Sequence, residues 1–153
     1  MKELRLTVYQ LKDLVAAVDF NLDEIEHFLN VETGDTVILT SFGASDEDEE
    51  LREEIDEGFG EIYFRVPSLE SSEGFAIMED FTRTVVNERL QDKLWDALSG
   101  GKGVFRRFKD TLAYDGVERD RYYKFLEEQH LKRVLEWFED MGFSFVIVHE
   151  GES

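Results

Sequence analysis

Apolar residues recur at helical spacing in several stretches of the chain. In the first, Thr7 precedes apolar residues spaced three and four positions apart, and a hydroxyl residue at that place is typical of a helix cap. We therefore expect a helix over 8–19. The same spacing predicts helices after Ser68, after Asn87, after the glycines of 100–103 and over 119–141, where Gly142 would end the helix.

Short runs of β-branched and aromatic residues predict strands. Residues 28–31 and 36–39 are expected to form a hairpin, because Gly34 between them can adopt the positive φ of a tight connection. Residues 62–66 and 143–148 predict two more strands. The expected fold is α+β, with a small antiparallel sheet of the hairpin, the strand near 62–66 and the C-terminal strand packed against about four to five helices.

Length and composition predict one domain over 1–153. The chain has 153 residues, of which 42% are hydrophobic, enough to form a core and to exclude wholesale disorder. Its start lacks the apolar run of a signal peptide, and no stretch is long enough to span a bilayer. The absence of cysteine excludes disulfides and suits a reducing compartment, so a cytoplasmic location without membrane contact is expected. The pattern does not predict the oligomeric state.

The formal charge of −19 is unevenly distributed along the chain. Residues 43–61 contain ten acidic residues and one basic residue. Only Leu51 and Ile55 form an apolar pair there, so we expect a short, weakly anchored acidic helix or a mobile loop. Its candidate interaction residues are Asp46, Glu49, Glu50, Glu53 and Glu54. Such a charge run either docks onto a basic protein or only keeps the chain soluble.

Basic residues gather instead in 101–133, which contains nine of them against six acidic residues. The glycines of 100–103 precede a predicted helix whose first free N–H groups, with nearby cations, are typical of an anion site. The candidate anion- or partner-binding residues are Lys102, Gly103, Arg106, Arg107 and Lys109. The alternative is a helix-to-helix turn followed by a solvated basic face, with Arg107 paired to a carboxylate.

Known catalytic and metal-binding patterns are absent from the sequence. The three histidines, His27, His130 and His149, have no metal-ligand spacing, and no nucleophile and base are placed together. We expect no metal, no cofactor and no catalytic residue, and His130 fits a hydrogen-bonded core histidine better than a general base. A small enzyme that uses Arg106 or Arg107 with Tyr123 or His130 is the least supported alternative.

Several segments together resemble a known family. They are Gly101-Lys102-Gly103-Val104-Phe105-Arg106-Arg107-Phe108-Lys109-Asp110, Tyr122-Tyr123-x-Phe125, Glu136-Trp137-Phe138-Glu139 and Val31-Glu32-Thr33-Gly34-Asp35. The chain is similar over most of its length to an uncharacterised family of small acidic bacterial proteins with a G-x-G-x-F-R-R-F-K-D segment. The resemblance implies a bacterial cytosolic domain and transfers no catalytic residue.

The leading hypothesis is a non-enzymatic acidic cytosolic domain that binds a basic protein partner through 43–61. The alternative is binding of nucleic acid or of a phosphorylated ligand through the basic segment around Arg106. The overall negative charge disfavours nonspecific contact with nucleic acid or an anionic membrane.

Overall fold

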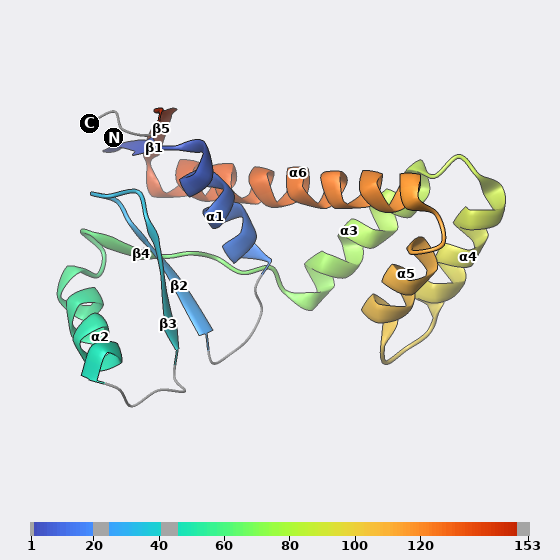
Figure 1. Cartoon of the computed structure of the whole chain (residues 1–153), viewed down its shortest axis with the longest axis horizontal. Coiled ribbons are helices and arrows are strands. Elements are labelled where there is room, and N and C mark those ends of the chain that lie inside the picture. The colour runs from blue at the N-terminus through green and yellow to red at the C-terminus, as the bar shows by residue number, and fades with distance from the viewer. Residues whose placement is uncertain (1, 20–24, 41–45, 150–153) are drawn as a thin grey trace. The chain divides into compact units, whose positions relative to one another are not determined.

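The computed structural model describes residues 2–19, 25–40 and 46–149, which form six helices and five strands (Figure 1). These residues belong to two compact units. We call residues 1–69 with 130–153 the sheet unit, and residues 70–129 the helical unit. The α+β class is confirmed. The prediction of a single domain over 1–153 stays a prediction.

The sheet unit contains all five strands. Its elements are β1 (Lys2–Leu6), α1 (Val8–Val18), β2 (Ile25–Asn30), β3 (Thr36–Thr40), α2 (Asp46–Gly58), β4 (Tyr63–Arg65), the last part of α6 (Gly116–Met141) and β5 (Phe143–Ile147). The predicted hairpin is confirmed as β2 and β3, and Gly34 in their connection has a φ of 83°. The predicted helix over 8–19 is confirmed as α1, which Thr7 and Gln10 cap reciprocally in a capping box.

One sheet is antiparallel, with the strand order β3-β2-β4. Successive side chains of a strand point to opposite faces, so Phe28 and Leu29 of β2 enter two different hydrophobic clusters. Phe28 packs in the cluster that contains Ile55 of α2. Leu29 packs in the cluster that contains residues of β1, α1, α6 and β5. The sheet is therefore covered on both faces, and α2 covers one of them.

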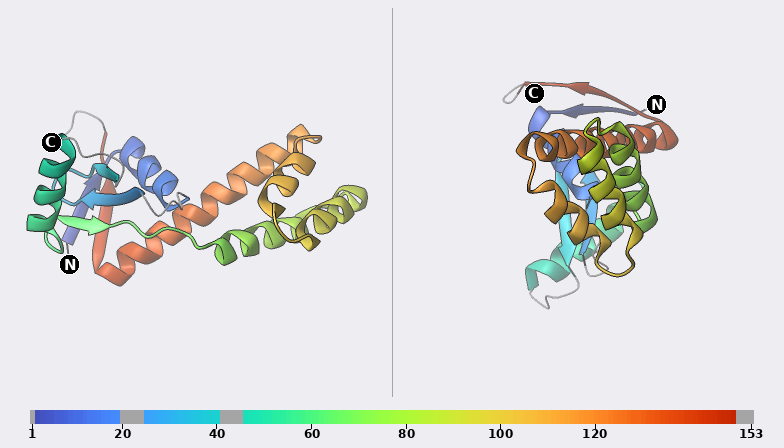
Figure 2. Two further views of the ribbon diagram at one scale, coloured as in Figure 1. Left: turned by 90° about the horizontal axis from the view of Figure 1, so that it is seen from below. Right: turned by 90° about the vertical axis from the view of Figure 1, so that its right-hand side faces the viewer.

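The C-terminal strand differs from its prediction, because β5 does not join this antiparallel sheet. It pairs in parallel with β1 in a separate two-stranded sheet, and the two strands lie side by side in Figure 2. In this register Leu4 is opposite Phe145 and Leu6 is opposite Ile147. The pairing depends on β1, which the sequence analysis did not predict, and Leu4 and Leu6 on alternate positions of β1 are both buried.

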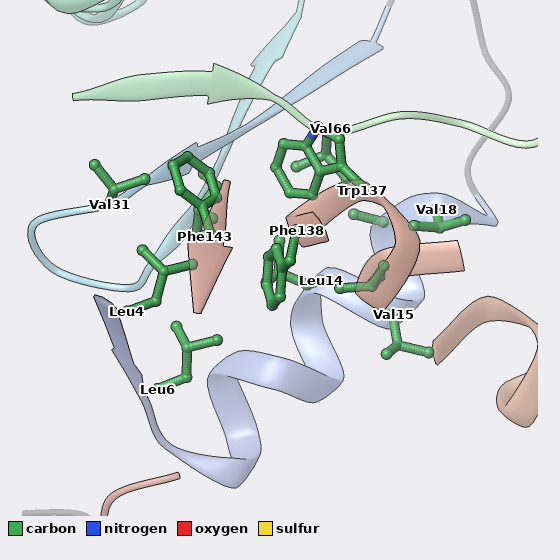
Figure 3. Close-up of a cluster of buried hydrophobic side chains, with 13 residues drawn as sticks. Leu4, Leu6, Leu14, Val15, Val18, Val31, Val66, Trp137, Phe138 and Phe143 are labelled. Atoms are coloured by element: carbon green, nitrogen blue, oxygen red, sulfur yellow. The ribbon is translucent and has the colours of Figure 1, made fainter. Parts of the chain in front are cut away.

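The main core of the sheet unit lies between α1, the end of α6 and the parallel pair (Figure 3). Leu14 and Val18 of α1 are fully buried, as is Leu6 of β1. Phe138 of α6 lies at a ring-centroid distance of 6.3 Å from Phe143 and 5.5 Å from Phe145. β5 therefore packs against this core through Phe143 and Phe145.

The helical unit packs four helices around one aromatic cluster. They are α3 (Ser71–Thr84), α4 (Glu88–Ser99), α5 (Val104–Leu112) and the first part of α6. Phe81, Phe108 and Tyr122 are buried and in mutual ring contact. Asn87 caps α4 by accepting the Leu90 N–H, as its position predicts. Among the described residues, no helix combines the length and the hydropathy that crossing a membrane requires.

The helix predicted over 119–141 begins three residues earlier, at Gly116. The Oδ1 atom of Asp115 accepts a hydrogen bond from the Glu118 N–H at 3.1 Å, so Asp115 caps this end of α6. At the other end Gly142 has a φ of 74°, which confirms it as the left-handed terminator.

Candidate functional site

The first candidate surface lies on α2, which turns out to be an anchored helix. Residues 43–45 of the acidic segment lie outside the described residues, and α2 covers Asp46–Gly58. Ile55 is 2% exposed and Leu51 packs beside it. Burying a side chain of this size contributes about 1.5–3 kcal/mol. Of the two forms expected for this segment the structure has the helix, and Ile55 fixes it to the sheet.

A hydrogen bond adds to this anchoring. The hydroxyl of Tyr63 in β4 donates to Oε1 of Glu54 at 2.8 Å. Tyr63 itself is 4% exposed. Burial, and after it the hydrogen bond to Glu54, raises the pKa of the Tyr63 phenol above its usual value of 10.0. Glu54 is thus tied to the sheet through a protonated tyrosine.

The opposite side of α2 presents carboxylates to solvent. Glu49, Glu50, Glu53 and Glu57 are all exposed. Glu49 and Glu53 are four residues apart, as are Glu53 and Glu57, so they are neighbours on the helix surface. Each like-charged pair at this spacing costs roughly 0.2–0.5 kcal/mol. We call these four residues the acidic surface of α2.

No cation of the described residues forms an ion pair with the acidic surface of α2. The last turn of α2 also lacks a basic residue, although the negative end of the helix dipole favours one there. Of the predicted residues, Glu49, Glu50 and Glu53 therefore share one exposed surface, and Glu54 contacts Tyr63. Asp46 begins α2, and its side chain lies outside the described part.

The charge imbalance follows the division into units. The sheet unit has 23 acidic and 7 basic residues, a formal charge of −16, whereas the helical unit has 13 and 10, a formal charge of −3. A potential of one sign over the sheet unit attracts cationic partners and repels anionic ones. The acidic surface of α2 lies in the unit that carries most of the charge.

The second candidate surface, around the start of α5, contains an arginine with a structural role. The Arg107 guanidinium donates three hydrogen bonds to carbonyl oxygens, from Nη1 to Lys102 at 2.6 Å, from Nη2 to Gly101 at 3.2 Å and from Nε to Ala97 at 3.4 Å. Ala97 lies in the last turn of α4, whose final carbonyls lack partners within the helix. Arg107 therefore caps the C-terminal end of α4 and stabilises the turn that follows it.

The glycines of this turn are explained by the same guanidinium. A Cβ at Gly100 would overlap the Nη2 atom of Arg107, so a side chain there would displace it. Gly103 has a φ of 85° and precedes α5 as its N-cap residue. Only glycine adopts this conformation at little cost. The glycines form the helix-to-helix turn of the alternative prediction, and Lys102, Arg106 and Lys109 are exposed as that prediction expected. Its carboxylate partner for Arg107 is not found among the described residues, because carbonyl oxygens accept the Arg107 hydrogen bonds.

The remaining cations of the second surface are exposed. Arg106 is 89% exposed on its side chain and lies 3.9 Å from Asp110, an ion pair of little energetic weight in water. Lys102 and Lys109 are exposed as well. The structure thus separates Arg107, which is committed to the fold, from Lys102, Arg106 and Lys109, which face solvent.

A groove of about 870 Å³ lies between α4 and α5 of the helical unit. Arg89 and Lys93, one turn apart on α4, line one wall, while Asp110 and Asp115 line the other together with the 94% exposed Tyr114. These residues were not among those predicted from the sequence, although Arg89 and Lys93 stand one helical turn apart in it. Charges of both signs line the groove, so it favours no one class of ionic ligand.

The histidines and acidic residues form no metal site among the described residues. His130 is buried, as predicted, and its Nε2 atom lies 3.6 Å from Oδ1 of Asp19 without a hydrogen-bond partner. The predicted hydrogen bond is therefore missing at this nitrogen. Burial lowers the pKa of His130, and the charge of Asp19 partly opposes this. Burial also lowers the pKa of His27.

Comparison with known proteins identifies the family. The chain belongs to an uncharacterised protein family, UPF0158, whose family model matches residues 1–152. This confirms the resemblance to an uncharacterised family. No curated protein and no solved structure matches the chain.

Proposed function

We propose that this member of the UPF0158 family is a non-enzymatic domain that binds a basic protein partner through the acidic surface of α2. The observation that carries the proposal is a row of exposed, like-charged carboxylates on a helix whose other side is buried. These carboxylates form no ion pair with any cation in the described part of the chain. The row has an internal electrostatic cost, which a cationic partner would relieve. A cytosolic location stays an expectation that suits the cysteine-free sequence.

The arrangement of the carboxylates favours a protein over a metal ion. Glu49 and Glu57 are eight residues apart, so the row extends roughly 12 Å along the helix. A single cation needs its oxygen ligands within about 2.0–2.6 Å of one point. Lysine or arginine residues one helical turn apart on a partner would instead match the spacing of the row. The partner is thus expected to present basic residues in a regular series.

Salt dependence should distinguish this contact from hydrophobic docking. The acidic surface of α2 is exposed to solvent, and salt screens exposed charges beyond about 8–10 Å at physiological ionic strength. Rim charges of this kind mainly accelerate association. Binding should therefore weaken as salt rises, chiefly through a slower association rate.

The test compares two variants with the same change in net charge. In the first, Glu49, Glu50, Glu53 and Glu57 are changed to Lys, which leaves Glu54 and Ile55 in place. In the control, the exposed residues Glu127, Glu128, Glu136 and Glu139 of α6 are changed to Lys. Binding of a lysine-rich helical peptide is titrated by fluorescence anisotropy at two salt concentrations. The α2 variant should bind at least about tenfold more weakly than the control variant.

Capture of cellular proteins extends the same comparison. Proteins retained by the wild type and by the control variant, but lost with the α2 variant and at high salt, are the expected partners. If both variants lose the peptide and the captured proteins equally, net charge alone is responsible and the proposal fails.

The alternative, nucleic acid or a phosphorylated ligand at the start of α5, ranks second because Arg107 already binds three carbonyls. Titration with single-stranded nucleic acid at low salt tests it. Binding that is lost on Arg106→Ala with Lys109→Ala would favour this alternative.

A further inference from the structure

The parallel pair of β1 and β5 has an unused edge. Within the described residues, β5 pairs only with β1, so its other edge faces no strand (Figure 2). Sheets of two strands are marginal by themselves, and an open edge is a template for another strand. The inner contacts of β5 come from Phe143 and Phe145, which pack against Phe138 of α6.

The direction of the backbone groups on this edge follows from one hydrogen bond. The Val148 N–H donates to the Leu6 carbonyl of β1 at 2.8 Å. Along a strand, the N–H and C=O groups of successive residues point alternately to the two sides. Ser144 and Val146 therefore direct theirs toward β1, and Phe145 and Ile147 direct theirs outward. The outer edge thus offers the donors and acceptors of the odd-numbered residues.

This edge lacks the features that usually prevent strand addition. Natural edges are protected by charged side chains, proline or bulges. Residues 143–148 have the sequence Phe-Ser-Phe-Val-Ile-Val, with no charge and no proline. Val146 and Ile147 are 39% and 45% exposed. An uncharged, β-favouring segment with exposed apolar side chains is suited to pairing.

We infer that β5 pairs antiparallel with β5 of a second copy of this chain, around a two-fold axis at Phe145. The resulting sheet has four strands, with the two β1 strands at its outer edges. In this register Phe145 lies opposite its counterpart, and Phe143 lies opposite Ile147 of the second copy. These residues have outward backbone groups, so they form the hydrogen-bonded pairs.

A second copy fits the edge because the segment is complementary to itself. Ser144 lies opposite Val146 of the second copy, and no like charges meet within the strands. The formal charge of −19 on each chain opposes dimerisation, because two copies repel each other. Salt screens this repulsion and leaves the edge hydrogen bonds in place. Dimerisation should therefore strengthen as salt rises, the opposite of binding to the acidic surface of α2.

The first test measures the mass of the full chain by sedimentation velocity over a range of concentrations and at two salt concentrations. The expected result is a reversible dimer that salt favours. Ile147→Pro removes an outward N–H from each copy and takes no donor from the ladder with β1. It should weaken dimerisation roughly tenfold or more, whereas Ile147→Thr, which keeps the N–H, should weaken it less. Circular dichroism verifies that both variants fold.

The second test fixes the register with cysteines, which the natural chain lacks. Directly opposite residues that are not hydrogen-bonded have Cα atoms about 4.5 Å apart, within disulfide range. Ser144→Cys and Val146→Cys chains, once mixed and oxidised, should cross-link with each other faster than either does with itself. A chain that stays monomeric at all concentrations and salts overturns the inference. A dimer that Ile147→Pro leaves unchanged also overturns it. So does a dimer in which the mixed chains cross-link no faster than each variant does with itself.

Discussion

The Tyr63 hydroxyl of β4 donates a 2.8 Å hydrogen bond to Glu54 of α2, so this carboxylate holds the helix to the sheet. Its neighbours Glu50 and Glu53 remain exposed to solvent. The glutamates of α2 therefore differ in role. Glu54 contributes to the fold, and the acidic surface of α2 is left for a partner.

The raised pKa of Tyr63 predicts sensitivity to alkali. The unfolded state releases the phenol proton near pH 10, while the folded state keeps it to higher pH. The contribution of Tyr63 is therefore complete below pH 10 and is lost as the pH rises from there through the folded pKa. Tyr63→Phe should reduce the free energy of unfolding by about 1 kcal/mol at pH 7 and flatten its fall above pH 10.

Urea unfolding at pH 7 and above pH 10 measures both effects. Tyr9→Phe is the matched control, because Tyr9 is 67% exposed and should change neither value. An equal alkaline loss in Tyr63→Phe and in the wild type would show that the phenol does not titrate in this way.

Two adjacent arginines should respond differently to the same change. Arg107→Lys loses the planar fork that binds the carbonyls of Ala97, Gly101 and Lys102, and lysine cannot reproduce it. We expect a loss of about 1–3 kcal/mol in unfolding free energy. Arg106→Lys, at a side chain 89% exposed, should change it by less than about 0.5 kcal/mol. Thermal and urea unfolding measure the difference, and equal effects would contradict the capping role of Arg107.

Local patterns predicted the elements whose determinants lie within a few residues. Thr7 with Gln10, Asn87 and Gly142 mark helix ends through backbone contacts of adjacent turns, and Gly34 permits the hairpin connection. The partner of β5 was missed because β1 lies at the other end of the chain, and parallel strands need a long crossover. The alternation of buried Leu4 and Leu6 was the available signal.

The sequence predicted which carboxylates of the candidate site are exposed, but it did not predict which contacts the other charged residues make. The sequence identified the exposed carboxylates Glu49, Glu50 and Glu53, since a charge run on a helix leaves most of its acids in water. It did not show that Glu54 contacts Tyr63, because that bond joins different elements. The sequence also suggested a carboxylate partner for Arg107, because residue spacing does not show the carbonyl oxygens at the end of the preceding helix.

Gly34 and Gly60 allow the cost of crowding to be separated from that of conformation. Both have a positive φ, 83° and 85°, so alanine at either position costs roughly 1–2 kcal/mol in conformational energy. A Cβ at Gly34 would also lie 2.8 Å from Oε1 of Gln10 and 3.1 Å from the Arg5 carbonyl, while a Cβ at Gly60 meets nothing within 4 Å. Gly34→Ala should therefore destabilise the chain more than Gly60→Ala in urea unfolding. Equal losses would mean that the Gln10 side chain and the backbone at Arg5 both move away at little cost.

His130 predicts a loss of stability in mild acid. Burial lowers the pKa of His130 below the usual histidine value of 6.5, so between 6.5 and the folded pKa the unfolded state binds more protons. The unfolding free energy should therefore fall as the pH drops below 6.5 and level off once the folded state is also protonated. His130→Gln should reduce this fall, although His27, whose pKa burial also lowers, leaves part of it. His149→Gln, at an exposed position, is the control.

Asp19 gives this explanation a sharper test, because its carboxylate lies 3.6 Å from the His130 ring and favours the protonated form. Asp19→Asn should lower the pKa of His130 further, so the acid loss continues to lower pH and becomes larger. At pH 7.5 the imidazole is neutral and the Asp19 side chain is 63% exposed, so the two proteins should then be nearly equally stable. Urea unfolding between pH 7.5 and 4.5 measures both curves. Curves that differ by a constant amount at every pH would mean that Asp19 acts on the fold and not on the protonation of His130.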